Sequence, residues 1–193
     1  MAISKRDHLV ETALNLFYRH GFHATGIDTI LAEAGVAKMT LYNHFKSKDD
    51  LIVAALHRHN KKFSGWFIAR MENTKNSDGG GSSPQEQLLC LFDVLGEWFL
   101  KDGFQGCFFV HAAYEYLANH DPIHAAARGQ KMQMLNYVRG LAEEAGARAP
   151  ASLAQGLVLL IEGATVMAHV AGDRNAAQNA GTAAAALIRD AGL

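Results

Sequence analysis

The fold is decided by residues 25–51, which read TGIDTILAEAGVAKMTLYNHFKSKDDL. Apolar residues at helical spacing predict one short helix over 27–34 and a second over 37–45. Gly35 lies between them, and glycine readily adopts the left-handed backbone conformation that ends a helix because it has no Cβ atom. Two short helices joined by such a turn are typical of the helix-turn-helix motif that binds DNA.

The second helix of this pair presents two different faces. Leu41 and Phe45 are four residues apart, so they share the face that packs on the preceding helices. On the opposite face, the Tyr42 hydroxyl suits a phosphate, and the Thr40 methyl or hydroxyl suits a base edge. A helix divided in this way can enter a major groove while its other face stays in the protein core. The side chains predicted to face DNA are Lys38, Thr40, Tyr42, Asn43 and His44.

Positive charge is concentrated at the N-terminal end of the chain. The net charge is −1, yet residues 1–62 carry nine Lys and Arg against six Asp and Glu, whereas the other 131 residues carry nine against thirteen. Six of the ten histidines also lie in 1–62, and an anionic partner favours their protonation. Lys48 lies at the expected start of the next helix, where its ammonium group and the first backbone N–H groups point at the same phosphate. We therefore expect the DNA contacts in this part of the chain.

The periodicity of apolar residues is helical along the whole chain, and no alternating strand pattern occurs. This predicts an all-α fold of about nine helices. Residues 73–84, NTKNSDGGGSSP, are polar and rich in Gly and Ser, which predicts a flexible connection. The first helix is expected between Ser4 and Gly21, and the others over 27–34, 37–45, 48–71, 85–100, 107–119, 122–145, 152–171 and 175–191.

The composition disfavours several classes of protein. With 193 residues, of which 49% are hydrophobic, the chain can bury a core and is not expected to be disordered. Two cysteines, Cys90 and Cys107, are too few for a disulfide framework and lack the spacing of a zinc site, so we expect both to be reduced and buried. His57 and His59 are two residues apart and face different sides of a helix. We therefore expect no metal site and no cofactor.

The chain shows no pattern typical of export or of a membrane span. Its N-terminus, MAISKRDHLVETAL, becomes amphipathic at once and lacks the apolar stretch and cleavage site of a signal peptide. The longest apolar segment, residues 157–170, has 14 residues, which is fewer than a membrane span requires. We expect a cytoplasmic protein that does not bind a membrane.

The N-terminal residues resemble the signature of the tetracycline-repressor family in residue type and in spacing. The resemblance covers about the first 55 residues. It implies an all-α regulator of transcription with an N-terminal three-helix DNA-binding head, residues 1–47, and a C-terminal helical domain, residues 48–193, for ligand binding and dimerisation. The matching residues are Ala13, Leu16, Phe17, Gly21, Phe22, Thr25, Ile30, Ala34, Gly35, Val36, Leu41, Tyr42, His44, Phe45, Lys48 and Leu51.

The resemblance also implies roles for single residues, and the sequence departs from the family at two positions. Ala37 stands where the family usually has Ser, which removes one capping or phosphate bond. Met39 stands where a small residue is common, which we expect to alter base preference. Phosphate contacts are implied for Thr25, Tyr42, His44 and Lys48. Base-facing positions are implied for Lys38, Met39, Thr40 and Asn43.

The resemblance implies a small-molecule site among the helices of the C-terminal domain. Large side chains recur in the middle of the sequence, and we expect most of them in the core. Ligand sites are mostly apolar with a few polar groups, for which Tyr114, Glu115 and Glu162 are the candidates. We predict an uncharged or weakly cationic ligand that is aromatic or lipophilic. The candidate ligand-binding residues are Trp66, Phe67, Phe99, Phe108, Tyr114, Glu115, Tyr137 and Glu162.

The last two expected helices are predicted to join two subunits. Residues 152–171 interleave large apolar side chains with Gly156 and Gly163, and residues 175–191 are rich in alanine. Small residues let helices approach closely, so two such helices from each subunit would form a four-helix bundle. The resemblance implies the same homodimer, and two weakly basic heads gain an avidity that one lacks. Packing within a single chain is the alternative.

These observations predict a ligand-responsive DNA-binding regulator, most simply a repressor that a small-molecule effector releases from double-stranded operator DNA. An enzyme is disfavoured, because the adjacent Glu143 and Glu144 face different directions and no Gly-rich phosphate loop or nucleophile motif occurs. An apolar carrier or storage protein with a helix-turn-helix-like end is the other alternative. A DNA-binding assay of the purified protein separates these possibilities.

Overall fold

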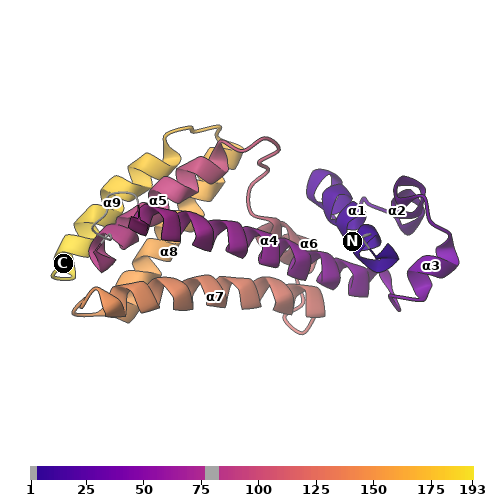
Figure 1. Ribbon diagram of the computed structural model, residues 1–193, viewed down its shortest axis with the longest axis horizontal. Coiled ribbons are helices and arrows are strands. Elements are labelled where there is room, and N and C mark those ends of the chain that lie inside the picture. Colours follow the sequence, from indigo (N-terminus) through magenta and orange to yellow (C-terminus); the bar gives the residue numbers. More distant parts are fainter. Residues whose placement is uncertain (1–3, 77–82) are drawn as a thin grey trace. The chain divides into compact units, whose positions relative to one another are not determined.

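The computed structural model describes residues 4–76 and 83–193, and within these ranges the backbone forms nine α-helices and no β-strand (Figure 1). The predicted all-α fold is confirmed. The helices are α1 (Lys5–His20), α2 (Ile27–Ala34), α3 (Lys38–Tyr42), α4 (Lys48–Asn76), α5 (Pro84–Phe99), α6 (Phe108–Glu115), α7 (Pro122–Glu144), α8 (Pro150–Val170) and α9 (Ala176–Asp190).

The first two helices have the predicted ends, and the third is shorter than predicted. The Ser4 side chain accepts a hydrogen bond from a backbone N–H of the first turn of α1, and Gly21 ends that helix with a φ of 83°. α2 occupies the predicted residues 27–34. α3 covers only Lys38–Tyr42 of the predicted 37–45, because Ala37 and Asn43 are its N-cap and C-cap residues and the chain has left the helix at His44 and Phe45.

The predicted end of the fourth helix is wrong. α4 continues to Asn76 instead of ending at residue 71, because no Gly or Pro follows until Gly79 and the intervening residues tolerate a helix. Residues 73–76, which were predicted to belong to a flexible connection, are therefore helical. Residues 77–82 of that predicted connection lie outside the described residues.

α6 is also shorter than predicted. It ends at Glu115 instead of residue 119, since Tyr116 leaves the helical conformation with a φ of −121° and a ψ of 85°. The Tyr116 carbonyl oxygen accepts a hydrogen bond from Nδ1 of the His124 ring at 2.8 Å. This contact with the first turn of α7 stabilises the bend that ends α6.

The chain divides into two compact units. The first consists of Met1–Phe63 and Cys107–Gln130, and the second of Ser64–Gly106 and Lys131–Leu193. α4 and α7 each contribute residues to both units. The predicted boundary after residue 47 separates a DNA-binding part from a part for ligand binding and dimerisation. This division by function stays a prediction.

Aromatic and aliphatic side chains form the core of the first unit. Phe17, Phe22 and Phe108 are almost wholly buried, and the ring centroid of Phe22 lies 5.3 Å from that of Phe17 and 4.9 Å from that of Phe108. Ile30 of α2 and Leu41 of α3 are fully buried in the same core. Burial of each such side chain contributes about 1.5–3 kcal/mol. The core therefore ties α1, α2 and α3 to α6.

In the second unit, α5, α8 and α9 pack against one another (Figure 1). A Cβ atom added at Gly181 of α9 would lie 3.2 Å from Cβ of Phe92 on α5, and one added at Gly156 of α8 would lie 3.0 Å from Cδ1 of Leu187 on α9. The buried face of α9 is mainly alanine. Part of the small-residue pattern predicted for a dimer therefore serves close packing within one chain.

α8 leaves much of its apolar surface exposed. Leu159, Val166, Met167 and Val170 are each at least half exposed, and with Gly163 they share one helical face. By length and composition α8 could cross a membrane, which the 14-residue apolar segment did not suggest, and only 33% of its apolar window is buried. A core or interface helix of a soluble protein meets the same test, so this finding does not by itself indicate a membrane protein.

Candidate functional site

α3 separates its side chains as the sequence predicts. Leu41 is fully buried and Phe45 is 4% exposed, so both anchor α3 and the turn that follows it. On the other side, Met39 is 71% exposed and Tyr42 is 45% exposed, which leaves them available to reach base edges and phosphates. The exposed or partly exposed residues of the predicted set are Lys38, Met39, Thr40, Tyr42, Asn43 and His44.

Contacts on both sides of α3 hold this exposed face in place. Gly35 adopts the left-handed conformation, with a φ of 63° and a ψ of 34°, and its backbone N–H donates to carbonyl groups of α2. Ala37 caps α3 without a side-chain hydrogen bond, as expected from the loss of Ser at this position. After α3, the guanidinium carbon of Arg6 lies 5.2 Å from the centroid of the Phe45 ring, a cation–π contact with α1.

The start of α4 presents Lys48, which is partly exposed. The backbone N–H of Asp50 donates to Oγ of Ser47 at 3.1 Å, and the Asp50 carboxylate accepts from the backbone N–H of Lys46 at 3.0 Å. These two bonds, one to Ser47 and one from Lys46, order the first turn of α4. Asp49 and Asp50 make this turn acidic, so a phosphate contact here depends on the Lys48 ammonium group.

Thr25 differs from the other predicted DNA contacts because its side chain is buried. Its hydroxyl donates a hydrogen bond to the carbonyl oxygen of Gly21 at 2.7 Å. This bond closes the turn between α1 and α2 upon itself. The phosphate contact implied for Thr25 stays a prediction.

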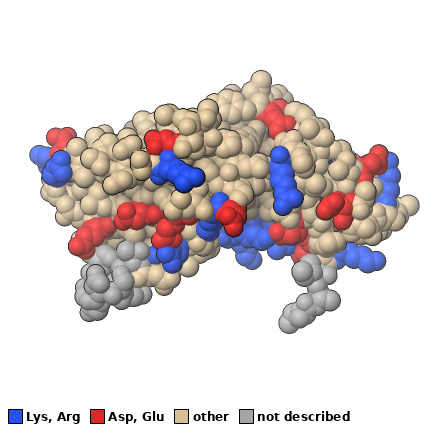
Figure 2. Space-filling view, turned by 90° about the horizontal axis from the view of Figure 1, so that it is seen from above, with Lys and Arg blue, Asp and Glu red and all other residues tan. Residues whose placement is uncertain are grey.

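Charge alone does not identify a DNA site in this chain. Figure 2 shows acidic and basic side chains interspersed on one face of the molecule, among many uncharged ones. The N-terminal excess of Lys and Arg supplies attraction to any nucleic acid, whereas base contacts specify a sequence. The exposed set on α3 is therefore the more specific indication of a DNA site.

Two ion pairs join α1 to α4 in the first unit. Asp7 pairs with Arg58, and Glu11 pairs with Lys62. A hydrogen bond from the Ser4 hydroxyl lowers the pKa of Asp7, and the Arg58 charge lowers it further. Sequence reasoning missed both pairs, since the partners are 51 residues apart and no local pattern links them.

His59 of α4 lies among aromatic rings. Its ring centroid is 5.0 Å from that of Phe108, 5.6 Å from that of Phe109 and 5.8 Å from that of Tyr18. Burial lowers the pKa of His59 to about 4, and the charge of Lys62 acts in the same direction. The imidazole is therefore neutral near pH 7 and packs as an uncharged ring.

Both cysteines are thiols, as predicted, but only Cys90 is buried. Cys107 is partly buried, because it lies at the N-cap of α6, where the chain enters that helix. Across residues 4–76 and 83–193, no group of three or more His, Cys, Asp and Glu side chains is placed to hold a metal ion.

The predicted ligand-binding residues divide between the two units. Phe108, Tyr114 and Glu115 belong to the first unit. Trp66, Phe67, Phe99, Tyr137 and Glu162 belong to the second. Their role in ligand binding stays a prediction. The contacts that these residues make are described below within each unit.

Three of the aromatic members in the second unit, Trp66, Phe67 and Tyr137, form contacts with one another. Phe67 meets both Trp66 and Tyr137 edge-to-face, with ring centroids 6.4 Å and 6.3 Å apart. The ammonium nitrogen of Lys101 lies 3.2 Å from the centroid of the Trp66 ring. Burial lowers the pKa of Lys101. Phe99 packs with two other rings of this unit.

The three polar candidates are not gathered together within one unit. The Glu115 carboxylate accepts hydrogen bonds from two backbone N–H groups of the turn between α1 and α2. Tyr114 is 76% exposed, and Glu162 pairs with Lys131 at 2.6 Å. Sequence reasoning missed the contact of Glu115, because partners 93 and 92 positions away leave no local signal.

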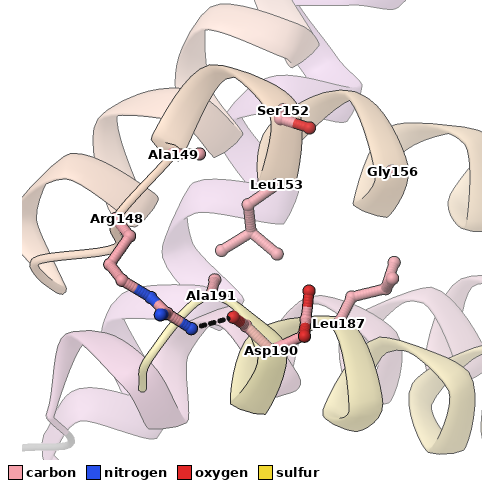
Figure 3. A pocket seen from close by; sticks show the side chains of 8 residues that line it. All are labelled: Arg148, Ala149, Ser152, Leu153, Gly156, Leu187, Asp190 and Ala191. Carbon is pink, nitrogen blue, oxygen red and sulfur yellow. Dashed lines mark hydrogen bonds between the residues drawn. The ribbon is translucent and has the colours of Figure 1, made fainter.

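A groove of about 650 Å³ lies in the second unit, between the start of α8 and the end of α9 (Figure 3). Leu153 and Leu187 supply apolar walls, and an Nη atom of Arg148 donates to the backbone oxygen of Asp190 at 2.5 Å. None of the predicted ligand-binding residues lines this groove. Its lining residues are Arg148, Ala149, Ser152, Leu153, Gly156, Leu187, Asp190 and Ala191.

Comparison with known proteins gives two family matches along the chain. Residues 9–55 match the tetR family of bacterial regulatory proteins, and residues 84–184 match the tetracyclin repressor-like C-terminal domain. The crystal structure of a TetR-family transcriptional regulator from Streptomyces coelicolor superimposes with a TM-score of 0.84 at 29% identity, covering 97% of this chain and 95% of that one.

Two curated relatives from Mycolicibacterium smegmatis match shorter stretches. The transcriptional repressor KstR2 is 33% identical over 89 residues, which cover 46% of this chain and 40% of the repressor. The transcriptional activator FasR is 46% identical over 55 residues, which cover 28% of this chain and 25% of the activator. The matches therefore span less than half of either relative.

The chain belongs to the TetR family of transcriptional regulators. Members of this family bind operator DNA and act as dimers with small-molecule effectors, and most are repressors. The family is one of regulators and not of enzymes.

Proposed function

We propose that the chain is a repressor that binds operator DNA as a homodimer and releases it when a small aromatic or lipophilic molecule binds the helical domain of residues 48–193. The observation that carries the proposal is the division of α3 into a buried face, with Leu41, and an exposed face, with Met39 and Tyr42. A helix that served only packing would not need to expose a methionine and a tyrosine side by side with Lys38.

The proposed contacts with DNA follow from exposure and chemistry. Tyr42 and Lys48 offer a hydroxyl and an ammonium group to phosphates, and Thr40 offers a methyl or hydroxyl group to a base edge. Residues 1–47 act as the DNA-binding head. The full proposed set is Thr25, Lys38, Met39, Thr40, Tyr42, Asn43, His44 and Lys48.

The proposed dimer uses the exposed apolar face of α8, together with α9. A continuous apolar stripe is formed by Leu159, Val166, Met167 and Val170, and its exposure to water is unfavourable. Gly163 lies in this stripe, and a Cβ atom added there would meet nothing within 4 Å in its own chain. A second copy of the chain is the occupant that the family supports.

The proposed effector site draws on the aromatic side chains. Phe67 packs edge-to-face against Trp66 and Tyr137, and this cluster of apolar rings supports an aromatic or lipophilic ligand that is uncharged or weakly cationic. α4 has residues in both units, so an effector that changes its position in one unit acts on the other. The proposed ligand-binding residues remain Trp66, Phe67, Phe99, Phe108, Tyr114, Glu115, Tyr137 and Glu162.

The repressor role and a cytoplasmic location are parts of the same proposal. A regulator must meet chromosomal DNA, which supports the cytoplasm. The repressor KstR2 and the activator FasR are both relatives, and the chain covers only part of each. We favour repression because most members of the family are repressors.

Selection from a pool of random duplexes tests the proposed function. The purified protein is incubated with the pool, and the retained DNA is amplified and sequenced over several rounds. We expect a roughly palindromic duplex whose half-sites are separated by about 34–36 Å or a modest stretch more, because two α3 helices of a dimer would meet one face of the duplex. Retention of no preferred sequence would contradict the proposed function and favour a carrier.

A further inference from the structure

The turn between α1 and α2 is held by the end of α6. Oε1 of Glu115 accepts a hydrogen bond from the backbone N–H of Phe22 at 2.8 Å, and Oε2 accepts one from the backbone N–H of His23 at 2.6 Å. One carboxylate therefore binds two consecutive backbone donors. Hydrogen bonds to an ionised acceptor are stronger than those between neutral groups.

Side-chain rings reinforce the same contact. Nε2 of His23 lies 2.9 Å from the backbone oxygen of Glu115, and because a carbonyl oxygen only accepts, the ring nitrogen donates. The His23 ring stacks on Tyr116 with centroids 4.8 Å apart, and the Phe22 ring meets Tyr116 edge-on at 6.3 Å. Glu115, the last residue of α6, and Tyr116, which follows it, thus contact Phe22 and His23 of the turn.

Gly21 permits the close approach of this carboxylate. Its φ of 83° is a conformation that favours glycine, and a Cβ atom added there would lie 3.0 Å from Oε1 of Glu115. The hydroxyl of Thr25 donates to the carbonyl oxygen of Gly21, and α2 begins two residues later, at Ile27. The Glu115 carboxylate therefore contacts the turn that leads directly into α2.

We propose that Glu115 is a positioning residue for DNA binding, whose carboxylate holds the α1–α2 turn in the arrangement that binds a duplex. This inference rests on the proposed function. It assigns Glu115 a role in the first unit that its prediction as a ligand-binding residue did not include. Without the carboxylate, a smaller fraction of the protein has the competent arrangement, and the apparent affinity falls by that fraction.

Electrostatics alone predicts the opposite change in affinity. Glu115 is negatively charged, so its removal from a DNA-binding unit reduces repulsion of phosphates and favours binding. If removal of this acidic group lowers the affinity for DNA, the loss must come from the turn that the carboxylate holds and not from its charge. This opposition of sign makes the contact testable with a single substitution.

The test compares Glu115→Gln with Glu11→Gln on the duplex that the wild-type protein selects. Glutamine keeps the size of the side chain but replaces one acceptor oxygen with an NH₂ group, which cannot accept from a backbone N–H. We expect Glu115→Gln to lower affinity by about tenfold, as for loss of one charge-assisted hydrogen bond. Glu11→Gln makes the same charge change in the same unit and removes only the surface pair with Lys62, so its affinity should be unchanged or slightly higher.

Amide hydrogen exchange supplies a readout specific to the contact. In Glu115→Gln, the amides of Phe22 and His23 should exchange faster, while those of Leu41 and Phe45 keep their protection. If the glutamine variant does not fold, Glu115→Asp replaces it with the same expectation, since its shorter side chain withdraws the carboxylate. Equal or higher affinity for the selected duplex in the folded variant would overturn the positioning role. Failure of the wild-type protein to select any duplex would instead contradict the proposed function.

Discussion

At the scale of single residues, His59 shows how the core of the first unit restricts ionisation. Four aromatic rings, those of Tyr18, Phe63, Phe108 and Phe109, surround its imidazole. Burial lowers its pKa from 6.5 to about 4. In the unfolded chain the same group titrates at its ordinary value.

His59 should therefore make stability depend on pH. Between pH 6.5 and about 4, the unfolded chain binds a proton at His59 that the folded protein does not, so the free energy of unfolding falls as the pH is lowered through this window. The full shift corresponds to about 3 kcal/mol. Urea unfolding of wild-type protein and His59→Phe, measured from about pH 7 to about pH 4.5, checks this.

The variant should lose less stability on acidification than the wild-type protein does. His57→Gln is the control, because His57 is exposed two residues away on the same helix. Parallel pH profiles for wild-type protein and His59→Phe would show that the imidazole is not shielded in the folded state.

Local spacing correctly predicted which residues in and just after α3 are buried and which are exposed. It did not predict the contacts between residues far apart in the sequence. The spacing of Leu41 and Phe45 correctly predicted that both are buried, although Phe45 lies beyond the end of α3 and not on its helical face. Glu115 was predicted to bind a ligand, yet its carboxylate meets backbone N–H groups 93 and 92 positions away. Only the fold brings these groups together, so no local pattern of residues predicts the contact.

At the scale of elements, α8 has two apolar faces with different roles. One face is buried within the chain through residues such as Leu157 and Ile161. The other carries Leu159 and Val170, which are 73% and 77% exposed. A helix that is apolar on both faces needs a second surface to cover the exposed one.

Gly163→Leu should separate the proposed dimer. The added side chain meets open space in its own chain, so each subunit should still fold, but a leucine at a close helix contact would force the two subunits apart. Sedimentation should show monomers, and operator affinity should fall because avidity is lost.

Gly129→Leu is the matched control for this substitution. Gly129 is also an exposed helical glycine with nothing within 4 Å of an added Cβ atom, but it lies on α7. It should leave the dimer intact. A Gly163→Leu protein that sediments as the wild-type dimer would place the interface elsewhere.

Helix boundaries were predictable where the sequence contains a cap or a stop signal. Ser4 and Gly21 bound α1 as expected. α4 ran past its predicted end because polarity alone does not end a helix, and α6 stopped early because Tyr116 and His124 make a contact that the sequence does not reveal.

At the scale of the whole molecule, the proposed regulation requires coupling between ligand and DNA. An effector needs to prefer the DNA-free arrangement by only about 3 kcal/mol to lower operator affinity roughly a hundredfold. Trp66 lies on α4, which has residues in both units, and its ring contacts Lys101. Its emission should respond when a ligand changes these surroundings.

A titration of aromatic cations and neutral lipophilic compounds tests this coupling. In a Trp98→Phe background, which leaves Trp66 as the sole tryptophan, emission should change over the same concentration range that releases a labelled operator duplex. A compound that binds tightly and leaves operator affinity untouched would contradict the coupling for that ligand class.

The central claim is that the exposed face of α3 and the start of α4 bind DNA. Its most direct test is the binding of Tyr42→Phe and Lys48→Ala to the selected duplex at several salt concentrations. Each variant should bind all sequences more weakly, by about 1 kcal/mol or more, and Lys48→Ala should reduce the salt dependence by about one phosphate contact. Thr40→Ala should instead change preference among duplexes. Binding isotherms of Tyr42→Phe and Lys48→Ala that coincide with the wild-type isotherm at every salt concentration would contradict the account.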